Sequence, residues 1–235
     1  MRVLVTGAAG YLGRAVVENL QPDYELRAFD CVETGLPGGV VGDIADFATV
    51  QRAVEGVDLV VNLALLTGRM ADPAPMFDVN VRGTYNVVRA AREAGVRRIV
   101  HMSSGAVVTG YPNDMPIHVD LPHKCEGIYP TVKCLQEVIC RLEAEAHGLT
   151  IVCLRPWGIV DGRTNTGKGD HPLTPGGSYF GLICRHDVAA AVRCALENPG
   201  LEGFQVFHLM ATPEGCARFD MDRTRSLLGW QATCD

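Results

Sequence analysis

A glycine-rich turn near the first residue constrains the fold more than any other feature. The apolar run Val3-Leu4-Val5 leads into Thr6-Gly7-Ala8-Ala9-Gly10-Tyr11-Leu12-Gly13, a G-x-x-G-x-x-G spacing one residue longer than the common dinucleotide fingerprint. Gly7 permits a tight turn, Gly10 lets the backbone approach a pyrophosphate, and Gly13 lets a helix pack against the strand. Because a helix N-terminus attracts anions, the turn predicts a site for dinucleotide phosphates.

A carboxylate indicates which dinucleotide binds. An amphipathic helix is expected over residues 11–20, before Pro22, and a strand over Glu25–Phe29 that leads to Asp30. Asp30 follows the glycines by about 20 residues, where a carboxylate accepts hydrogen bonds from the adenosine ribose. No Arg or Lys occurs in residues 31–39 to neutralise a 2′-phosphate, so we expect NAD rather than NADP.

Composition excludes several classes of function. The chain has 235 residues and a formal net charge of −6, without a basic run, which argues against a nucleic-acid groove or an anionic membrane surface. The first residues have no signal-peptide pattern, and no apolar run approaches membrane-spanning length. We therefore expect a cytoplasmic protein that binds neither nucleic acid nor membrane.

Cysteine and histidine usage does not indicate a metal. The nine cysteines form no C-x-x-C pair, and most are expected to be small buried hydrophobic residues of a cytosolic protein. His118, His123 and Cys125 are the nearest approach to a ligand cluster, but a fourth well-spaced ligand is missing. No metal is predicted.

Strand and helix patterns alternate along the first two thirds of the chain. Strands are expected at 3–5, 25–29, 40–41, 57–63, 98–102 and 150–154, and helices at 11–20, 46–55, 73–94 and 129–147. After a polar loop at 161–170, a helix at 187–197, a strand at 204–209 and a short helix at 222–228 follow. This order predicts an α/β fold with a doubly wound parallel sheet of the Rossmann type. Residues 1–235 are expected to form one domain, with an NAD-binding core at 1–155 and a reduced substrate-binding part at 156–235.

Tyr129 and Lys133 are a candidate pair for acid–base catalysis. They are four residues apart at the start of the helix expected over 129–147, so they lie on one face. A nearby ammonium would lower the pKa of the phenol, which is about 10 in isolation. The pair is then a general base for a substrate hydroxyl, or an acid in the reverse direction.

Two hydroxyls stand at the end of the preceding strand. Ser103 and Ser104 follow the run Arg98–Met102, and ligands of open α/β sheets gather at the carboxyl ends of the strands. A serine at this place can hydrogen-bond the oxygen that is oxidised or reduced, close to Tyr129.

Together these motifs resemble the extended short-chain dehydrogenase/reductases, the NAD-dependent epimerase/dehydratase group. The matching segments, in family order, are Thr6 to Gly13, Asp30, Gly42-Asp43-Ile44, Asn62-Leu63-Ala64, Asn80 to Thr84, Ser103-Ser104, Tyr129 with Lys133, Leu154-Arg155-Pro156, Arg185 to Ala189 and Leu227 to Trp230. The resemblance covers nearly the whole chain.

The resemblance implies a set of cofactor contacts. Asp43 and Ile44 match the segment beside the adenine, Leu63 and Ala64 match backbone that passes the cofactor, and Pro156-Trp157 match the stretch that meets the carboxamide. Asn80 matches an asparagine on the nicotinamide side. The predicted cofactor set is therefore Gly7, Ala9, Gly10, Tyr11, Leu12, Gly13, Asp30, Asp43, Ile44, Leu63, Ala64, Asn80, Tyr129, Lys133, Pro156 and Trp157.

The chain departs from the family pattern in two ways. The segment Ser103 to Gly110 has one extra residue: counting from the strand selects Ser104 as the catalytic hydroxyl, and counting back from Gly110 would place Gly105 there. The chain is also shorter than nucleotide-sugar enzymes of the family, which makes it more similar to compact members such as the uronate dehydrogenases. Ser103, Gly105, Arg163 and Asn165, with Lys168, are candidates for contact with a sugar or a carboxylate.

The sequence thus predicts an NAD-dependent oxidoreductase that acts on a hydroxyl of a sugar or sugar acid through Ser104, Tyr129 and Lys133. A nucleotide-sugar epimerase or dehydratase with tightly bound NAD is one alternative, and a non-catalytic NAD-binding regulatory protein is another. The resemblance also implies a homodimer formed through the helices at 73–94 and 129–147.

Overall fold

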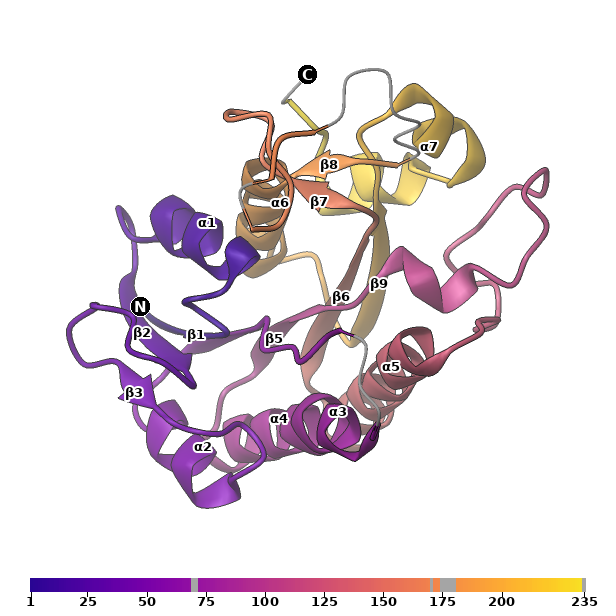
Figure 1. Cartoon of the computed structure of the whole chain (residues 1–235). Coiled ribbons are helices and arrows are strands. Elements are labelled where there is room, and N and C mark those ends of the chain that lie inside the picture. Colours follow the sequence, from indigo (N-terminus) through magenta and orange to yellow (C-terminus); the bar gives the residue numbers. More distant parts are fainter. Residues whose placement is uncertain (69–71, 170, 174–180, 234–235) are drawn as a thin grey trace.

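A seven-stranded parallel sheet forms the centre of the molecule (Figure 1). The computed structural model describes residues 1–68, 72–169, 171–173 and 181–233. The strand order is β3-β2-β1-β4-β5-β6-β9, and every neighbouring pair is parallel. The strands are β1 (Arg2–Thr6), β2 (Glu25–Asp30), β3 (Val40–Val41), β4 (Leu59–Asn62), β5 (Arg98–Met102), β6 (Thr150–Pro156) and β9 (Phe204–Leu209). The predicted α/β doubly wound fold is confirmed.

Helices cover both faces of the sheet. They are α1 (Tyr11–Leu20), α2 (Phe47–Val54), α3 (Ala74–Phe77), α4 (Gly83–Glu93), α5 (Ile128–His147), α6 (Arg185–Glu197) and α7 (Pro213–Arg218), with the short turns η1 (Asp78–Arg82), η2 (Gly105–Val108) and η3 (Thr224–Leu228). Figure 1 shows α1 and α6 on one face and α2, α4 and α5 on the other. Each face has its own apolar core, built on strands whose residues are buried on both sides.

The sheet reverses its winding direction between β1 and β4. From β1 the chain moves outward to β2 and β3, then returns to β4 on the other side of β1 and continues to β5, β6 and β9. Such a reversal opens a crevice at the carboxyl ends of the two central strands, where ligands of open α/β sheets bind. The glycine turn follows β1 at this point.

The part of the chain after residue 155 is joined closely to the first part. β9 pairs with β6 along Ile151–Pro156, and Arg193 on α6 donates hydrogen bonds to Asn19 in α1 and to Asp23 just after it. The boundary predicted at residue 155 stays a prediction, but both sides of it contribute to one sheet.

Some elements differ from the sequence-based expectation. The helix expected at 73–94 is interrupted by the π-helical turn η1, and the helix expected at 222–228 is mainly the π-helical turn η3. The pair β7 (Ile159–Val160) and β8 (Ile183–Cys184) was not predicted, because two-residue strands carry no readable alternation. The helix α7 was also missed, although Thr212 caps it by accepting from Gly215 N at 3.1 Å and Pro213 opens it.

The expected burial of the cysteines is wrong in part. Cys140, Cys153 and Cys184 are buried, but Cys31 is exposed and four others are only partly covered: Cys125, Cys134, Cys194 and Cys216. Among the described residues no three His, Cys, Asp or Glu side chains gather as metal ligands. Within the same ranges, every helix is too short or too polar to cross a membrane.

Candidate active site

One cavity of about 720 Å³ lies at the crevice between β1 and β4. It brings together segments that are far apart in the sequence: the glycine turn, the end of β2, the end of β4, the end of β5 and the first turn of α5. The predicted residues that line it are Gly7, Ala9, Gly10, Tyr11, Leu12, Gly13, Asp30, Asp43, Ile44, Leu63, Ala64, Ser103, Ser104, Tyr129, Lys133, Pro156 and Trp157.

The glycine turn has the close packing that a dinucleotide site needs. Gly7 has φ +68°, and a Cβ on it would lie 2.8 Å from the backbone N of Ala64. A Cβ on Gly13 would lie 2.0 Å from the carbonyl oxygen of Gly7. No side chain caps α1 at Gly10, so the end of the helix remains open toward the cavity. The turn therefore fits a pyrophosphate placed against the N-terminus of α1.

Asp30 is held at the end of β2 where an adenosine ribose would lie. Its Oδ2 accepts a hydrogen bond from the backbone N of Ala9 at 2.9 Å, which ties the carboxylate to the glycine turn. Asp43 and Ile44 line the same end of the cavity. The acceptor oxygens of Asp30 and the lining at this end fit the adenosine half of a dinucleotide.

Tyr129 and Ser104 meet at the other end of the cavity. Tyr129 belongs to the first turn of α5, with Pro130 beside it, and Ser104 follows β5. Burial raises the pKa of Tyr129 above its ordinary value, and a hydrogen bond with Ser104 acts in the opposite direction. Ser104 Oγ also accepts from the backbone N of Ala106 at 3.1 Å, which fixes the side chain.

Lys133 lies one helical turn further along α5. The side chain is 2% exposed, and its Nζ donates to the carbonyl oxygen of Met102 at 2.7 Å. Burial lowers the pKa of Lys133 to about 8, and the nearby carboxylate of Glu137 opposes this shift. We expected Lys133 to lower the pKa of Tyr129, but in this structure that pKa is raised, because burial outweighs the hydrogen bond that lowers it.

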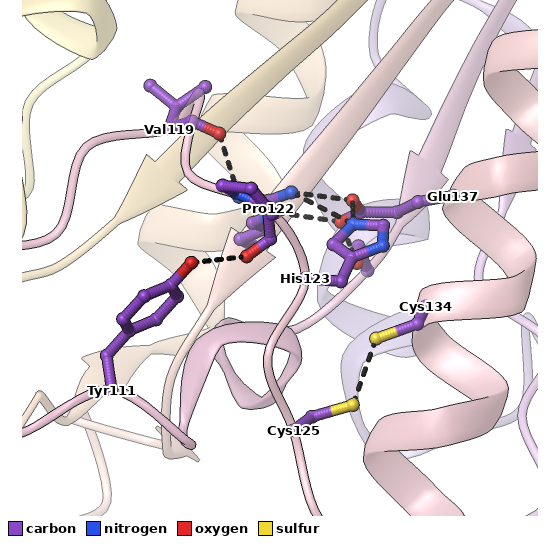
Figure 2. A network of polar contacts seen from close by, with 9 residues as sticks. Tyr111, Val119, Pro122, His123, Cys125, Cys134 and Glu137 are labelled. Atoms are coloured by element: carbon purple, nitrogen blue, oxygen red, sulfur yellow. Dashed lines mark hydrogen bonds and ion pairs between the residues drawn. The ribbon is translucent and has the colours of Figure 1, made fainter.

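A buried ionic network supports this end of the site (Figure 2). Glu137 receives two hydrogen bonds from the guanidinium of Arg155, at 2.8 and 2.7 Å, and one contact from His123 Nε2 at 2.7 Å. Ser103 Oγ donates to Glu137 as well. Burial alone would raise the pKa of Glu137, but the Arg155 and His123 interactions hold it well below its ordinary range. Arg155 therefore ties β6 to α5.

Sequence reasoning missed Glu137, although a signal was present. Glu137 follows Lys133 by four residues and so shares the face of α5 that Tyr129 and Lys133 present to the sheet. The carboxylate connects α5 with the ends of β5 and β6 and with the loop that precedes α5.

Four predicted residues do not line the cavity. Asn80 is buried in η1, where its side chain hydrogen-bonds both the backbone N and O of Leu66 at 2.8 Å. Gly105 packs under Trp157, since a Cβ would lie 2.4 Å from that ring. Arg163 pairs with Glu18 at 2.9 Å on the surface, and Asn165 has φ +55° in the polar loop.

The remaining loop candidate, Lys168, does line the cavity. Within the described part of the chain its ammonium has no hydrogen-bond or ion-pair partner. An anionic group of a ligand is the natural partner for such a cation.

Comparisons with known proteins agree with this geometry. The family model described as NAD dependent epimerase/dehydratase family matches residues 3–172. A 3-beta-hydroxysteroid dehydrogenase of Mycolicibacterium neoaurum is 32% identical in an alignment 187 residues long that covers 73% of this chain and 50% of that protein. The matched part of this chain thus spans about half the length of that relative.

Two solved structures cover almost the entire chain. A short-chain dehydrogenase/reductase superfamily protein from Agrobacterium tumefaciens, crystallised with bound NAD, superposes with a TM-score of 0.87 at 26% identity, over 99% of this chain and 93% of that one. Uronate dehydrogenase from Agrobacterium tumefaciens gives a TM-score of 0.81 at 27% identity, over 99% of this chain and 84% of that one.

Proposed function

The chain belongs to the NAD-dependent epimerase/dehydratase family, so NAD is its cofactor, and from this premise we propose that it oxidises a hydroxyl of a sugar or sugar acid. The single observation that carries the proposal is the cavity, which holds Ser104, Tyr129 and Lys133 at one end and the glycine turn with Asp30 at the other. The first group is suited to acid–base chemistry on a hydroxyl, and the second is suited to a dinucleotide.

Each residue of the site has a distinct task. Tyr129 Oη accepts the proton of the substrate hydroxyl, and Ser104 Oγ orients the substrate oxygen beside it. Lys133, anchored on Met102 O, supplies the positive charge that favours the phenolate. Bound NAD supplies the acceptor for the hydride, which leaves the carbon that carries the substrate hydroxyl. We assign this task to Ser104 rather than to Ser103, because the Ser103 hydroxyl donates its proton to Glu137.

The proposed substrate class rests on Lys168. Its ammonium lines the cavity, has no partner among the residues that the structure describes, and suits the carboxylate of a sugar acid. A uronate dehydrogenase from Agrobacterium tumefaciens is among the structures that this chain resembles. A uronic acid is therefore the first substrate to test.

The experiment is a panel assay that follows the absorbance of reduced nicotinamide. Purified protein and NAD are mixed with uronic acids, aldoses, a hydroxysteroid and nucleotide sugars. Net formation of NADH with a uronic acid or an aldose supports the proposal. Conversion of a nucleotide sugar without net NADH would instead indicate an epimerase or dehydratase, and tight NAD binding with no turnover would indicate a regulatory protein.

A hydroxysteroid is the second candidate substrate. The lining of the cavity includes apolar side chains, among them Leu65, Leu66 and Val79. The relative from Mycolicibacterium neoaurum is named a 3-beta-hydroxysteroid dehydrogenase. Net NADH with the hydroxysteroid alone would select this candidate.

Lys168→Ala tests whether Lys168 binds the carboxylate of the substrate or the pyrophosphate of NAD. If Lys168 binds the substrate carboxylate, the variant raises KM for the uronic acid by about 10-fold or more and leaves the Kd of NAD unchanged. The matched control is Arg163→Ala in the same loop, whose side chain pairs with Glu18 outside the cavity. A weaker NAD affinity with an unchanged substrate KM would place Lys168 on the pyrophosphate instead.

We also propose a homodimer formed through α4 and α5. Ile128, Leu135 and Leu142 are exposed at intervals of seven residues along α5, and Tyr85 is exposed on α4. An apolar stripe of this kind on two adjacent helices is typical of a helix-to-helix interface.

A further inference from the structure

Two cysteines lie next to each other beside the active site. Cys125, in the loop before α5, and Cys134, on α5, have their Sγ atoms 3.1 Å apart (Figure 2). Both side chains are only partly covered, so a small molecule in solution can reach them. They stand on either side of Tyr129 and Lys133 in the sequence. No part of the proposed chemistry uses either thiol.

The loop is held in the position that keeps the two sulfurs together. The backbone N of Lys124 donates to the carbonyl oxygen of Val107 at 2.9 Å, and His123 Nε2 contacts Glu137 at 2.7 Å. Gly127, with φ +98°, turns the chain between the cysteines. A disulfide has an S–S length of about 2.05 Å, so the two sulfurs need to approach by only about 1 Å.

We propose that Cys125 and Cys134 are a redox-active dithiol, which hydroperoxides convert into an intramolecular disulfide. Nothing in the established family membership assigns a role to this pair. The bond closes a loop that contains the first turn of α5 with Tyr129 and ends next to Lys133.

The two sulfurs have different tasks in this reaction. Burial, together with the Cys125 contact, raises the pKa of Cys134 to about 12, so Cys134 stays a thiol. We assign Cys125, in the loop, as the sulfur that attacks the peroxide: it gives up its proton, its sulfur forms a bond to one peroxide oxygen, and the O–O bond breaks. The other oxygen takes up a proton and departs as water, or as an alcohol from an organic hydroperoxide. Cys134 sulfur then attacks the sulfenic sulfur, the S–O bond breaks, and the hydroxide leaves as water with the Cys134 proton.

Peptide mapping tests the proposal directly. The protein is treated with a small excess of hydrogen peroxide, remaining thiols are alkylated, and the sample is digested with trypsin without reduction. Cleavage after Lys124, Lys133 and Arg141 gives the peptides 125–133 and 134–141. We expect these two peptides to be linked, two hydrogens lighter than their sum, and to separate with dithiothreitol. Fragmentation distinguishes Cys134 from Cys140, which lies in the same peptide.

Thermal unfolding gives a second readout. A disulfide that closes so short a loop should raise the Tm of the oxidised protein by about 5 °C. The rise should be absent in Cys125→Ser and in Cys134→Ser, and present in Cys31→Ser, which removes an exposed thiol elsewhere. Recovery of Cys125 and Cys134 as alkylated thiols while Cys31 is oxidised would overturn the proposal, as would a link to Cys140. Neither readout uses turnover, so this proposal can fail without affecting the proposed function.

Discussion

At the scale of single residues, the site depends on how burial and hydrogen bonding act on Tyr129. The sequence predicted Tyr129, Lys133 and Ser104 from their spacing and from the family resemblance, and the structure brings all three to one cavity. The sequence could not predict the direction in which the Tyr129 pKa shifts, because burial depends on the tertiary packing around the ring. It also left Ser104 and Gly105 as alternatives, and the structure favours Ser104, since Gly105 packs beneath Trp157.

Ser104→Ala should change both the rate and its dependence on pH. Oxidation requires a deprotonated Tyr129, so kcat/KM should rise with pH toward the alkaline range. Loss of the hydrogen bond that lowers the Tyr129 pKa should move this rise to higher pH, and kcat should fall by about 100-fold. Steady-state kinetics across pH measure both effects. Ser226→Ala, on the surface, is the control, and an unchanged profile in Ser104→Ala would exclude Ser104 from the site.

At the scale of elements, α5 is positioned by Glu137. The sequence predicted the helix and its end at Gly148, which has φ +64°. It did not predict the partners of Glu137, because Ser103, His123 and Arg155 come from three other segments. Spacing along one helix reveals which residues share a face, but not what that face meets.

Glu137→Gln should be destabilising at neutral pH and should alter acid unfolding. The variant leaves the Arg155 guanidinium buried without its counter-ion, which costs about 3 kcal/mol or more in the free energy of unfolding. The wild-type carboxyl has a folded-state pKa well below its unfolded value, so its contribution is complete above about pH 4.3 and is lost as the pH falls. The difference between wild type and variant should therefore shrink below that pH.

Urea unfolding at several pH values checks this prediction. Glu93→Gln is the matched control, because Glu93 is an exposed carboxylate that pairs with Arg89 on α4. A Glu137→Gln variant as stable as the wild type at neutral pH would show that the network does not hold α5.

At the scale of the whole molecule, the strand order determines where the site lies. The alternation of strands and helices predicted the parallel sheet, and the resemblance predicted the family and NAD, which the family match confirms. The contact between the glycine turn and Ala64 arises only because β4 lies beside β1. The two-residue strands β7 and β8 pair only with each other and carry no readable alternation, so the sequence did not predict them.

The proposed homodimer gives a prediction at this scale. Replacing both Leu135 and Leu142 with Glu places charges in the apolar stripe of α5 and should convert a dimer into a monomer. Light scattering after size-exclusion chromatography measures the mass of each form, and circular dichroism verifies that the variant is folded. A monomeric wild type would contradict the proposed dimer. A variant that remains dimeric would place the interface on another surface.

Tyr129 is the proton acceptor of the proposed reaction, and Tyr129→Phe tests this role most directly. The variant keeps the ring that packs at the start of α5 and removes only the hydroxyl. With the substrate found in the panel assay, we predict that NADH formation falls by at least about 1,000-fold, while the Kd of NAD, measured by calorimetry, stays within about twofold of the wild type. NADH formation at a rate close to the wild type would contradict the mechanism.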